Sequence, residues 1–271
     1  MTEPIHAPPG TPGATDPLQQ LLASFEQLAA GSTCLRREPS LVESCGPETV
    51  TLPCYSFRGP SAGSELTRVG IFGGIHGDEP ESAIGLVRFV RDLEAKPSMA
   101  EGYCLYIYPV CNPRGFSAGT RNSPAAVDLN REFWRESAQP EVRLLEQELK
   151  ARAFEGIISL HGDDTSHGLY GFVSGSTLTK YLLNPALKAA SRALPLNAGP
   201  VIDGFNAEDS MIFDGYHGIL SAPPEQKPHP FQIVFEVPHL APAAAQDEAF
   251  ALALETILTE YRQLVAYSIN L

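Results

Sequence analysis

A strongly apolar run ends abruptly in a polar cluster early in the chain. Residues 69–75 (VGIFGGI) have the composition of a buried strand, residues 76–79 (HGDE) follow at once, and Pro80 opens a helical pattern. This order predicts a strand, a tight turn and a helix, and therefore a sheet against which helices pack. On such a turn, His76 and Glu79 are close enough in sequence to reach one metal ion together.

A second histidine has the same setting. His161 follows the apolar run 156–160 (GIISL), and a glycine follows it, which leaves room beside the backbone for a metal ion and a substrate. Two histidines and a glutamate leave one position of a tetrahedral zinc ion open, as in catalytic zinc sites. However, HxxE is a weak motif, and a lone histidine is more often an ordinary core or surface residue. A single zinc ion bound by His76, Glu79 and His161 is therefore a prediction that needs the further motifs below.

Strand-like and helical segments alternate along the chain. Strands are expected at 49–57, 68–75, 103–110, 156–160 and 232–237, and helices at 18–30, 82–93, 140–154, 178–194 and 247–267. This alternation predicts an α/β fold, a three-layer αβα arrangement with a mixed, largely parallel central sheet. In such sheets ligands gather at the carboxyl ends of strands, and His76, His161 and Glu236 all fall at or next to such ends.

The composition describes an acidic chain that can form a sizeable core. Of its 271 residues 43% are hydrophobic, and Lys plus Arg against Asp plus Glu gives a net charge of 19 − 32 = −13. That balance argues against nucleic acid and anionic membranes as partners, and no apolar run approaches the ~20 residues of a membrane span. Residues 1–16 lack an apolar signal sequence, so we expect a disordered lead-in before one catalytic domain at 17–271. Five cysteines without a CxxC pair favour reduced thiols in a cytoplasmic protein.

Further polar residues stand where they could serve a reaction. Arg121, Asn130 and Arg131 lie in one long loop, where Arg131 can hold a carboxylate bidentately and Asn130 can add a donor. The alternative is that they are solvated surface residues. Glu236 interrupts an apolar strand (IVFEV), and a charge there needs a reason. It is either half of a structural ion pair or a general base for a water molecule at the metal.

Six short motifs occur in a characteristic order: HGDE, NPRGF, TR, DLNR, SLHG and FEVP. Together they resemble the zinc metallocarboxypeptidase family, which includes the carboxypeptidase A-like enzymes and the aspartoacylase/succinylglutamate desuccinylase branch. The resemblance covers roughly residues 66–240 and implies the zinc carboxypeptidase-like, phosphorylase/hydrolase-like fold. By this resemblance His76, Glu79 and His161 match the zinc ligands, and Glu236 matches the general base.

The resemblance also assigns roles to the loop residues. Asp128 matches a carboxylate that orients the first zinc histidine, and Arg121 matches the arginine that stabilises the developing oxyanion. Asn130 and Arg131 match the pair that binds the substrate carboxylate. Tyr216 lies roughly where carboxypeptidases carry a mobile, substrate-contacting tyrosine, although no motif surrounds it.

The resemblance leaves two substrate classes open. The expected reaction is hydrolysis of an amide next to a free carboxylate, in a small peptide or an N-acyl amino acid. The close spacing of TR and DLNR (130 − 121 = 9) is typical of the desuccinylase branch and favours an N-acyl amino acid deacylase. Only 271 − 236 = 35 residues follow Glu236, enough for one closing helix, and this single-domain architecture favours a metallocarboxypeptidase, the leading interpretation. A non-catalytic zinc-binding protein is the least favoured, because Glu236 and Arg121 are both present.

Overall fold

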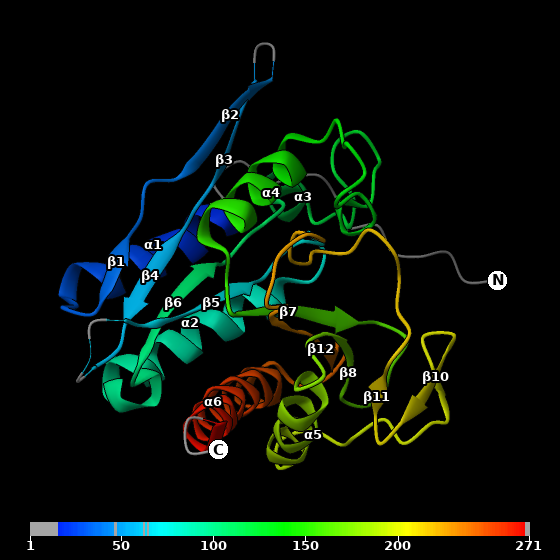
Figure 1. Ribbon diagram of the computed structural model, residues 1–271. Helices are drawn as coiled ribbons and strands as arrows, with labels where there is room; N and C mark the ends of the chain where they lie inside the picture. Colours follow the sequence, from blue (N-terminus) through cyan, green and yellow to red (C-terminus); the bar gives the residue numbers. More distant parts are fainter. Residues whose placement is uncertain (1–15, 46–47, 62, 64, 269–271) are drawn as a thin grey trace.

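The structure is a computed structural model that describes residues 16–45, 48–61, 63 and 65–268 (Figure 1). Except for Asp16, the lead-in expected at 1–16 lies outside the described residues. The Asp16 side chain accepts a hydrogen bond from the backbone N–H of Leu18 and thereby caps the first helix, α1 (Pro17–Gly31).

Four parallel strands form the centre of a mixed sheet, in the order β6-β5-β7-β12. Outer strands, most of them antiparallel to their neighbours, extend the sheet beyond β6 and beyond β12. The central strands are β5 (Thr67–Phe72), β6 (Tyr103–Tyr108), β7 (Gly156–Asp163) and β12 (Phe231–Pro238). The outer strands are β1 (Leu35–Arg37), β4 (Tyr55–Arg58), β8 (Tyr170–Gly175), β9 (Val201–Ile202), β10 (Phe205–Glu208) and β11 (Met211–Ile212).

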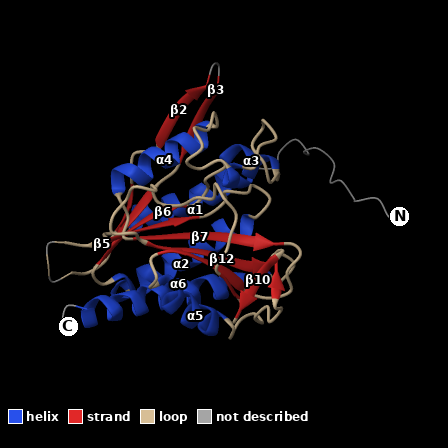
Figure 2. Ribbon diagram, turned by 45° about the vertical axis from the view of Figure 1, so that its right-hand side comes forward, coloured by secondary structure: helices blue, strands red, loops and turns tan. Residues whose placement is uncertain are grey.

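Helices cover both faces of this sheet and give three layers (Figure 2). One apolar core joins α1, α2, α5 and α6 to one face, and a second core joins α4 to the other. The stacked rings of Phe72 and Tyr108, with centroids 4.6 Å apart, belong to the second core. The fold therefore confirms the predicted three-layer α/β class. The remaining helices are α2 (Pro80–Ala95), α3 (Pro113–Ala118), α4 (Pro140–Arg152), α5 (Thr179–Ala190) and α6 (Ala243–Ser268), with the short 3₁₀ helices η1 (Pro97–Ala100) and η2 (Leu129–Arg131).

The strand expected at 49–57 is in fact two strands in two sheets. β3 (Glu48–Leu52) pairs with β2 (Leu41–Cys45) in a separate hairpin, whereas β4 joins the main sheet. Pro53 lies between them. Because proline has no backbone N–H to give to a strand pairing, it interrupts the strand at this point.

The other expected segments are right in type but differ at their ends. The strand expected at 68–75 ends at Phe72, because Gly74 has a φ of +57° and turns the chain. The closing helix begins at Ala243, earlier than the expected 247. These shifts leave the segment 73–79 as a turn, which is the part of the chain that carries the HGDE cluster.

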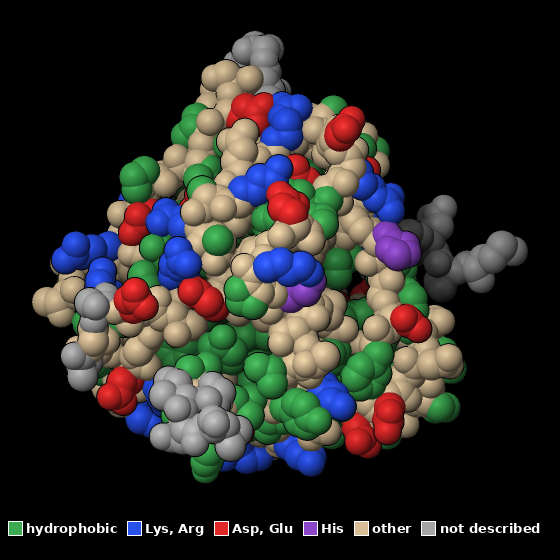
Figure 3. Space-filling model, viewed as in Figure 1, with side chains coloured by type: hydrophobic (Ala, Val, Ile, Leu, Met, Phe, Trp, Pro, Cys, Tyr) green, Lys and Arg blue, Asp and Glu red, His purple; other side chains and the backbone are tan. Residues whose placement is uncertain are grey.

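The surface carries charges of both signs. Lys and Arg side chains lie interspersed with Asp and Glu side chains over the face shown in Figure 3. No helix within the described residues has the length and apolar character that a membrane span requires.

Candidate active site

The HGDE segment forms a tight turn between β5 and α2. Gly77 packs directly on the backbone of α3, where a Cβ atom would lie 2.0 Å from the carbonyl carbon of Gly115, so only glycine fits. Glu79 is the last residue before α2, and Pro80 occupies the first helical position. The turn therefore holds His76 and Glu79 at the carboxyl end of β5.

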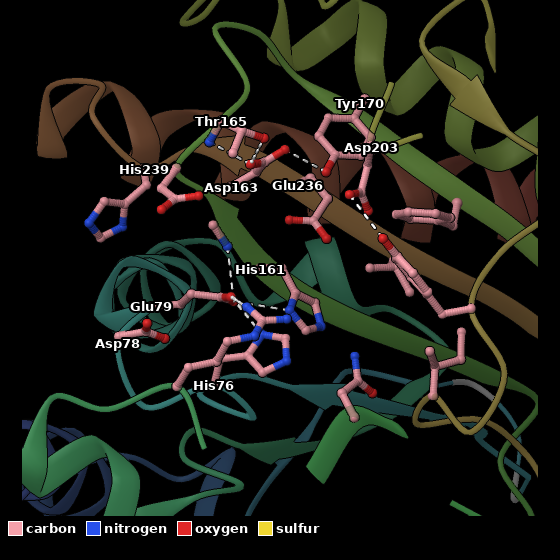
Figure 4. A pocket seen from close by; sticks show the side chains of 18 of the residues that line it. His76, Asp78, Glu79, His161, Asp163, Thr165, Tyr170, Asp203, Glu236 and His239 are labelled. Carbon is pink, nitrogen blue, oxygen red and sulfur yellow. Dashed lines mark hydrogen bonds and ion pairs between the residues drawn. The ribbon is translucent and has the colours of Figure 1, made fainter. Parts of the chain in front are cut away.

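Three buried side chains meet at this point (Figure 4). One possible ligand atom from each of His76, Glu79 and His161 lies within 4.8 Å of the other two. His76 Nδ1 is 2.6 Å from Oε1 of Glu79, and His161 Nδ1 is 3.0 Å from Oε2 of the same carboxylate. The structure thus brings together the three residues that the sequence predicts as metal ligands.

The second nitrogen of each imidazole ring has a different partner. His76 Nε2 lies 3.2 Å from Oδ1 of Asp128, and His161 Nε2 lies 2.9 Å from Oγ of Ser159. Metal-binding histidines are usually held in this way, which fixes the ring and directs the other nitrogen at the ion. Two imidazole nitrogens and one carboxylate, each fixed by a neighbour, therefore fit a divalent metal ion.

Arg121 lies beside this group of ligands. Its guanidinium donates to Oε1 of Glu79 at 3.0 Å and to Oδ2 of Asp128 at 3.3 Å. Burial alone would raise the pKa of Glu79, but the charges and hydrogen bonds of His161 and His76 lower it, so the carboxylate is held ionised. The Arg121 side chain is still 44% exposed, and it lines the same cavity as the three ligands.

Asn130 and Arg131 lie in η2 and line the cavity. The Asn130 Oδ1 atom accepts a hydrogen bond from Leu220 N at 2.8 Å, which leaves the amide Nδ2 as its remaining donor. The Arg131 guanidinium carbon lies 3.7 Å from the ring centroid of Tyr216, a cation–π contact. The Tyr216 hydroxyl donates to Oδ1 of Asp203 at 3.0 Å. Tyr216, for which no sequence motif exists, therefore reaches the cavity beside Arg131.

Glu236 lies next to His161 because β12 and β7 pair in parallel with these two residues opposite each other. It is 9% exposed, and among the described residues its carboxylate has neither a hydrogen bond nor an ion pair. The structural ion pair considered for it is therefore not formed there. Burial raises the pKa of Glu236 well above its usual value, and the negative charges of Glu79, Asp163 and Asp203 raise it further.

The predicted site residues other than Asp128 line one cavity of about 650 Å³, and Asp128 contacts His76 from outside the lining. This volume is typical of pockets for small ligands. The cavity wall also contains acidic residues that no motif identifies. Asp163 accepts hydrogen bonds from the backbone and hydroxyl of Thr165, as expected for a turn, and one from the hydroxyl of Tyr170 at 2.8 Å.

Asp203 is the clearest residue that the sequence motifs miss. With Gly204 it forms the tight turn between β9 and β10, and the two residues have φ values of +51° and +80°. The dipeptide Asp-Gly is a recognisable hairpin signal in the sequence. That signal predicts the turn but does not indicate that the turn reaches the cavity, because its position depends on the pairing of β11 with β8.

Comparison with known proteins gives matches over much of the chain. The model of the succinylglutamate desuccinylase/aspartoacylase catalytic domain matches residues 65–196. Carboxypeptidase SOL1 of Arabidopsis thaliana is 34% identical over 106 residues, which cover 33% of this chain and only 22% of that protein. A candidate metallopeptidase from Shewanella denitrificans superposes with a TM-score of 0.70 at 22% identity, covering 89% of this chain and 88% of the other. A metallo-carboxypeptidase from Pseudomonas aeruginosa superposes with a TM-score of 0.69 at 17% identity, covering 90% and 68%.

The fold and the family match point to one class of protein: the chain is similar to metallohydrolases. More narrowly, residues 65–196 are similar to the succinylglutamate desuccinylase/aspartoacylase catalytic domain, and the fold is similar to that of metallo-carboxypeptidases, in agreement with the resemblance seen in the sequence motifs. Because the sequence identity to the solved structures is low, these superpositions show a similarity of fold alone.

Proposed function

We propose that this protein is a zinc-dependent hydrolase of the metallocarboxypeptidase type, which cleaves an amide bond next to a free carboxylate. One observation supports this most: a buried carboxylate without a partner, Glu236, opens into the cavity that holds the His76, Glu79 and His161 group. A purely structural metal site has no use for such a carboxylate.

His76, Glu79 and His161 would hold the zinc ion. Two imidazole nitrogens and one carboxylate are a donor set of catalytic zinc sites. When bound, zinc supplies Lewis acidity and lowers the pKa of a water molecule to about 7. Asp128 and Ser159 keep the two rings oriented for this role.

Glu236 is the proposed proton carrier. It takes a proton from the attacking water and delivers it to the leaving nitrogen, a role that typically accelerates a reaction 10²–10⁴-fold. Its position opposite His161, one of the proposed ligands, supports this role. Because no other described residue binds the carboxylate, it is free to exchange the proton.

The two arginines would each bind one negatively charged group of the reacting substrate. Arg121, beside Glu79, would stabilise the negative charge that develops on the carbonyl oxygen. Arg131 and the amide nitrogen of Asn130 would hold the substrate carboxylate, which does not react, and so position the scissile bond. Tyr216 supports Arg131 from the side.

The relatives support a carboxylate-bearing substrate but differ in its kind. The Pseudomonas aeruginosa structure contains (2-guanidinoethylmercapto)succinic acid, a carboxylate ligand. The curated relative is a carboxypeptidase, whereas the family model describes desuccinylases and aspartoacylases. The second candidate function is therefore an N-acyl amino acid deacylase, which the match over residues 65–196 favours.

The test combines metal analysis with a hydrolysis screen. The purified protein is expected to contain one zinc ion per chain and to hydrolyse C-terminal dipeptides or N-acyl amino acids, but not their carboxamide analogues. A protein that retains zinc and hydrolyses none of these substrates would be a non-catalytic zinc-binding protein. The same screen separates the carboxypeptidase from the deacylase by the better substrate class.

A further inference from the structure

A second pair of interacting residues, one of them buried, lies at the cavity and has no part in the mechanism described above. Glu81, in the first turn of α2, is 5% exposed and lies 2.9 Å from Nδ1 of His239. His239 follows β12 directly, its side chain is 35% exposed, and it lines the same cavity as the metal ligands.

Several parts of the fold are shaped around this pair. A Cβ atom at Gly162 would lie 1.5 Å from Oε1 of Glu81, so the glycine after His161 leaves the space that Glu81 fills. The backbone of His239 is also fixed, because its N–H donates to Asp163 O and its carbonyl accepts from Gln246, both at 2.9 Å. His239 is therefore held in one position by α2, β7 and α6.

The second nitrogen of the His239 ring, Nε2, is available to a ligand in the cavity. Nδ1 is engaged with the Glu81 carboxylate, and Nε2 has no partner in the described part of the chain. Burial lowers the pKa of His239, but the hydrogen bond and charge of Glu81 raise it above its usual value, with help from Asp164 and Asp78. In the protonated ring both nitrogens carry a hydrogen, so Nε2 can donate to a ligand while Nδ1 donates to Glu81, and the direction of the pKa shift favours this form.

His239 lies at the end of the cavity away from the proposed carboxylate clamp. Figure 4 shows His239 and Asp203 on opposite sides of Glu236, and Asp203 binds the tyrosine that contacts Arg131. If the substrate carboxylate lies at Arg131 and the scissile bond at Glu236, the acyl part of the substrate extends toward His239.

We propose that His239 donates a hydrogen bond from Nε2 to a carbonyl oxygen in the acyl part of the substrate, and that Glu81 positions it. This inference rests on the proposed function and narrows the class of substrate that it allows. The substrate then carries a second carbonyl beyond the scissile one, as a peptide does and a simple N-acetyl amino acid does not.

The test compares two probes with the same C-terminal residue: an N-acetyl amino acid, and the N-acetyl-glycyl compound that has one more peptide carbonyl. The zinc-loaded protein is expected to prefer the longer probe. His239→Ala is expected to reduce the ratio of kcat/KM between the long and short probes about tenfold, mainly through KM, because one hydrogen bond to substrate is lost. His167→Ala, which changes an exposed histidine in the β7–β8 loop outside the cavity, is the matched control and leaves the ratio unchanged.

The role of Glu81 is tested by two substitutions. Glu81→Gln keeps an acceptor for Nδ1 but removes the carboxylate charge, so the ratio is expected to fall between that of the unaltered protein and that of His239→Ala. Glu81→Met removes the acceptor as well and is expected to reduce the ratio as His239→Ala does. The double variant Glu81→Met/His239→Ala is expected to show no further loss, because both changes remove the same contact. Zinc content, measured in every variant, shows whether the nearby ligand Glu79 is disturbed.

The outcomes separate the two proposals. Equal losses for both probes in His239→Ala, or no loss for either, would overturn the role of His239. Turnover of the acetyl probe with no preference for the longer one would also overturn it, but would leave the proposed hydrolase intact as a deacylase. A zinc-loaded protein that hydrolyses neither probe would contradict the proposed function itself.

Discussion

The residue with the greatest chemical consequence is Glu236. An unpaired carboxylate with 9% exposure in an apolar strand is costly for a protein, and such groups are found mostly at functional sites. The sequence allows this inference directly, because the glutamate is visible inside an apolar run. The sequence does not show that Glu236 stands opposite His161, since that depends on the register of two strands far apart in the chain.

Glu236→Gln is expected to keep the zinc content and lower kcat at least 10³-fold, because an amide cannot carry the proton. The measurement is steady-state hydrolysis of the best substrate alongside zinc analysis. Glu208→Gln, an exposed residue on β10, is the control and should behave as the unaltered protein does. Substantial activity in Glu236→Gln would remove Glu236 from the mechanism.

Arg131→Ala is expected to raise KM about 10- to 100-fold for substrates with a free carboxylate, since a charge-assisted contact is lost. Hydrolysis of carboxamide analogues should change little. Arg36→Ala, which alters an exposed arginine on β1, serves as the control. Equal losses for carboxylate and carboxamide substrates would contradict the clamp.

Asp128→Ala is expected to weaken zinc binding 10- to 100-fold, because His76 loses the carboxylate that orients its ring. Competition with a chromogenic chelator measures this affinity. Unchanged affinity would show that the contact has no role in holding the metal.

At the scale of elements, the strands and helices that carry motifs can be predicted from their apolar patterns. The short strands that form part of the cavity wall cannot. β5, β7 and β12 are apolar enough to be recognised, and each delivers a predicted site residue near its carboxyl end. The strands β9–β11 are only two to four residues long and have little apolar pattern. Their place beside β8 comes from tertiary pairing, so Asp203 could not be assigned to the cavity from sequence.

The turn after β5 offers a test at this scale. Gly77→Ala is expected to destabilise the protein by about 1–3 kcal/mol and to weaken zinc binding, because a methyl group would collide with the backbone at Gly115. Gly31→Ala is the control, since a Cβ atom there meets nothing within 4 Å. Denaturant unfolding and zinc competition are the measurements. Equal stability of the two variants would contradict the close packing of the turn on α3.

For the whole molecule, metal binding is expected to stabilise the fold. The three proposed ligands come from the β5–α2 turn and from β7, so an ion bound there links parts of the chain that are far apart in sequence. Zinc at 100 times its Kd would add about 2.7 kcal/mol to the free energy of unfolding. For a chain of this size, removal by a chelator is therefore expected to lower Tm by roughly 5–10 °C.

Scanning calorimetry with and without chelator measures this difference. His76→Ala, which removes one proposed ligand, is expected to show a much smaller response to the chelator. An identical Tm for the unaltered protein in both conditions would argue against a resident metal ion.

The pairing of β7 with β12 has a consequence for how such a protein can diversify. His161 and Glu236 are direct partners in a pairing that runs the full length of both strands, so this part of the site is built into the central sheet. Asp203 and Tyr216 belong to short peripheral segments instead. Substitutions in those peripheral segments can therefore change the substrate preference while the residues that carry out the reaction stay the same.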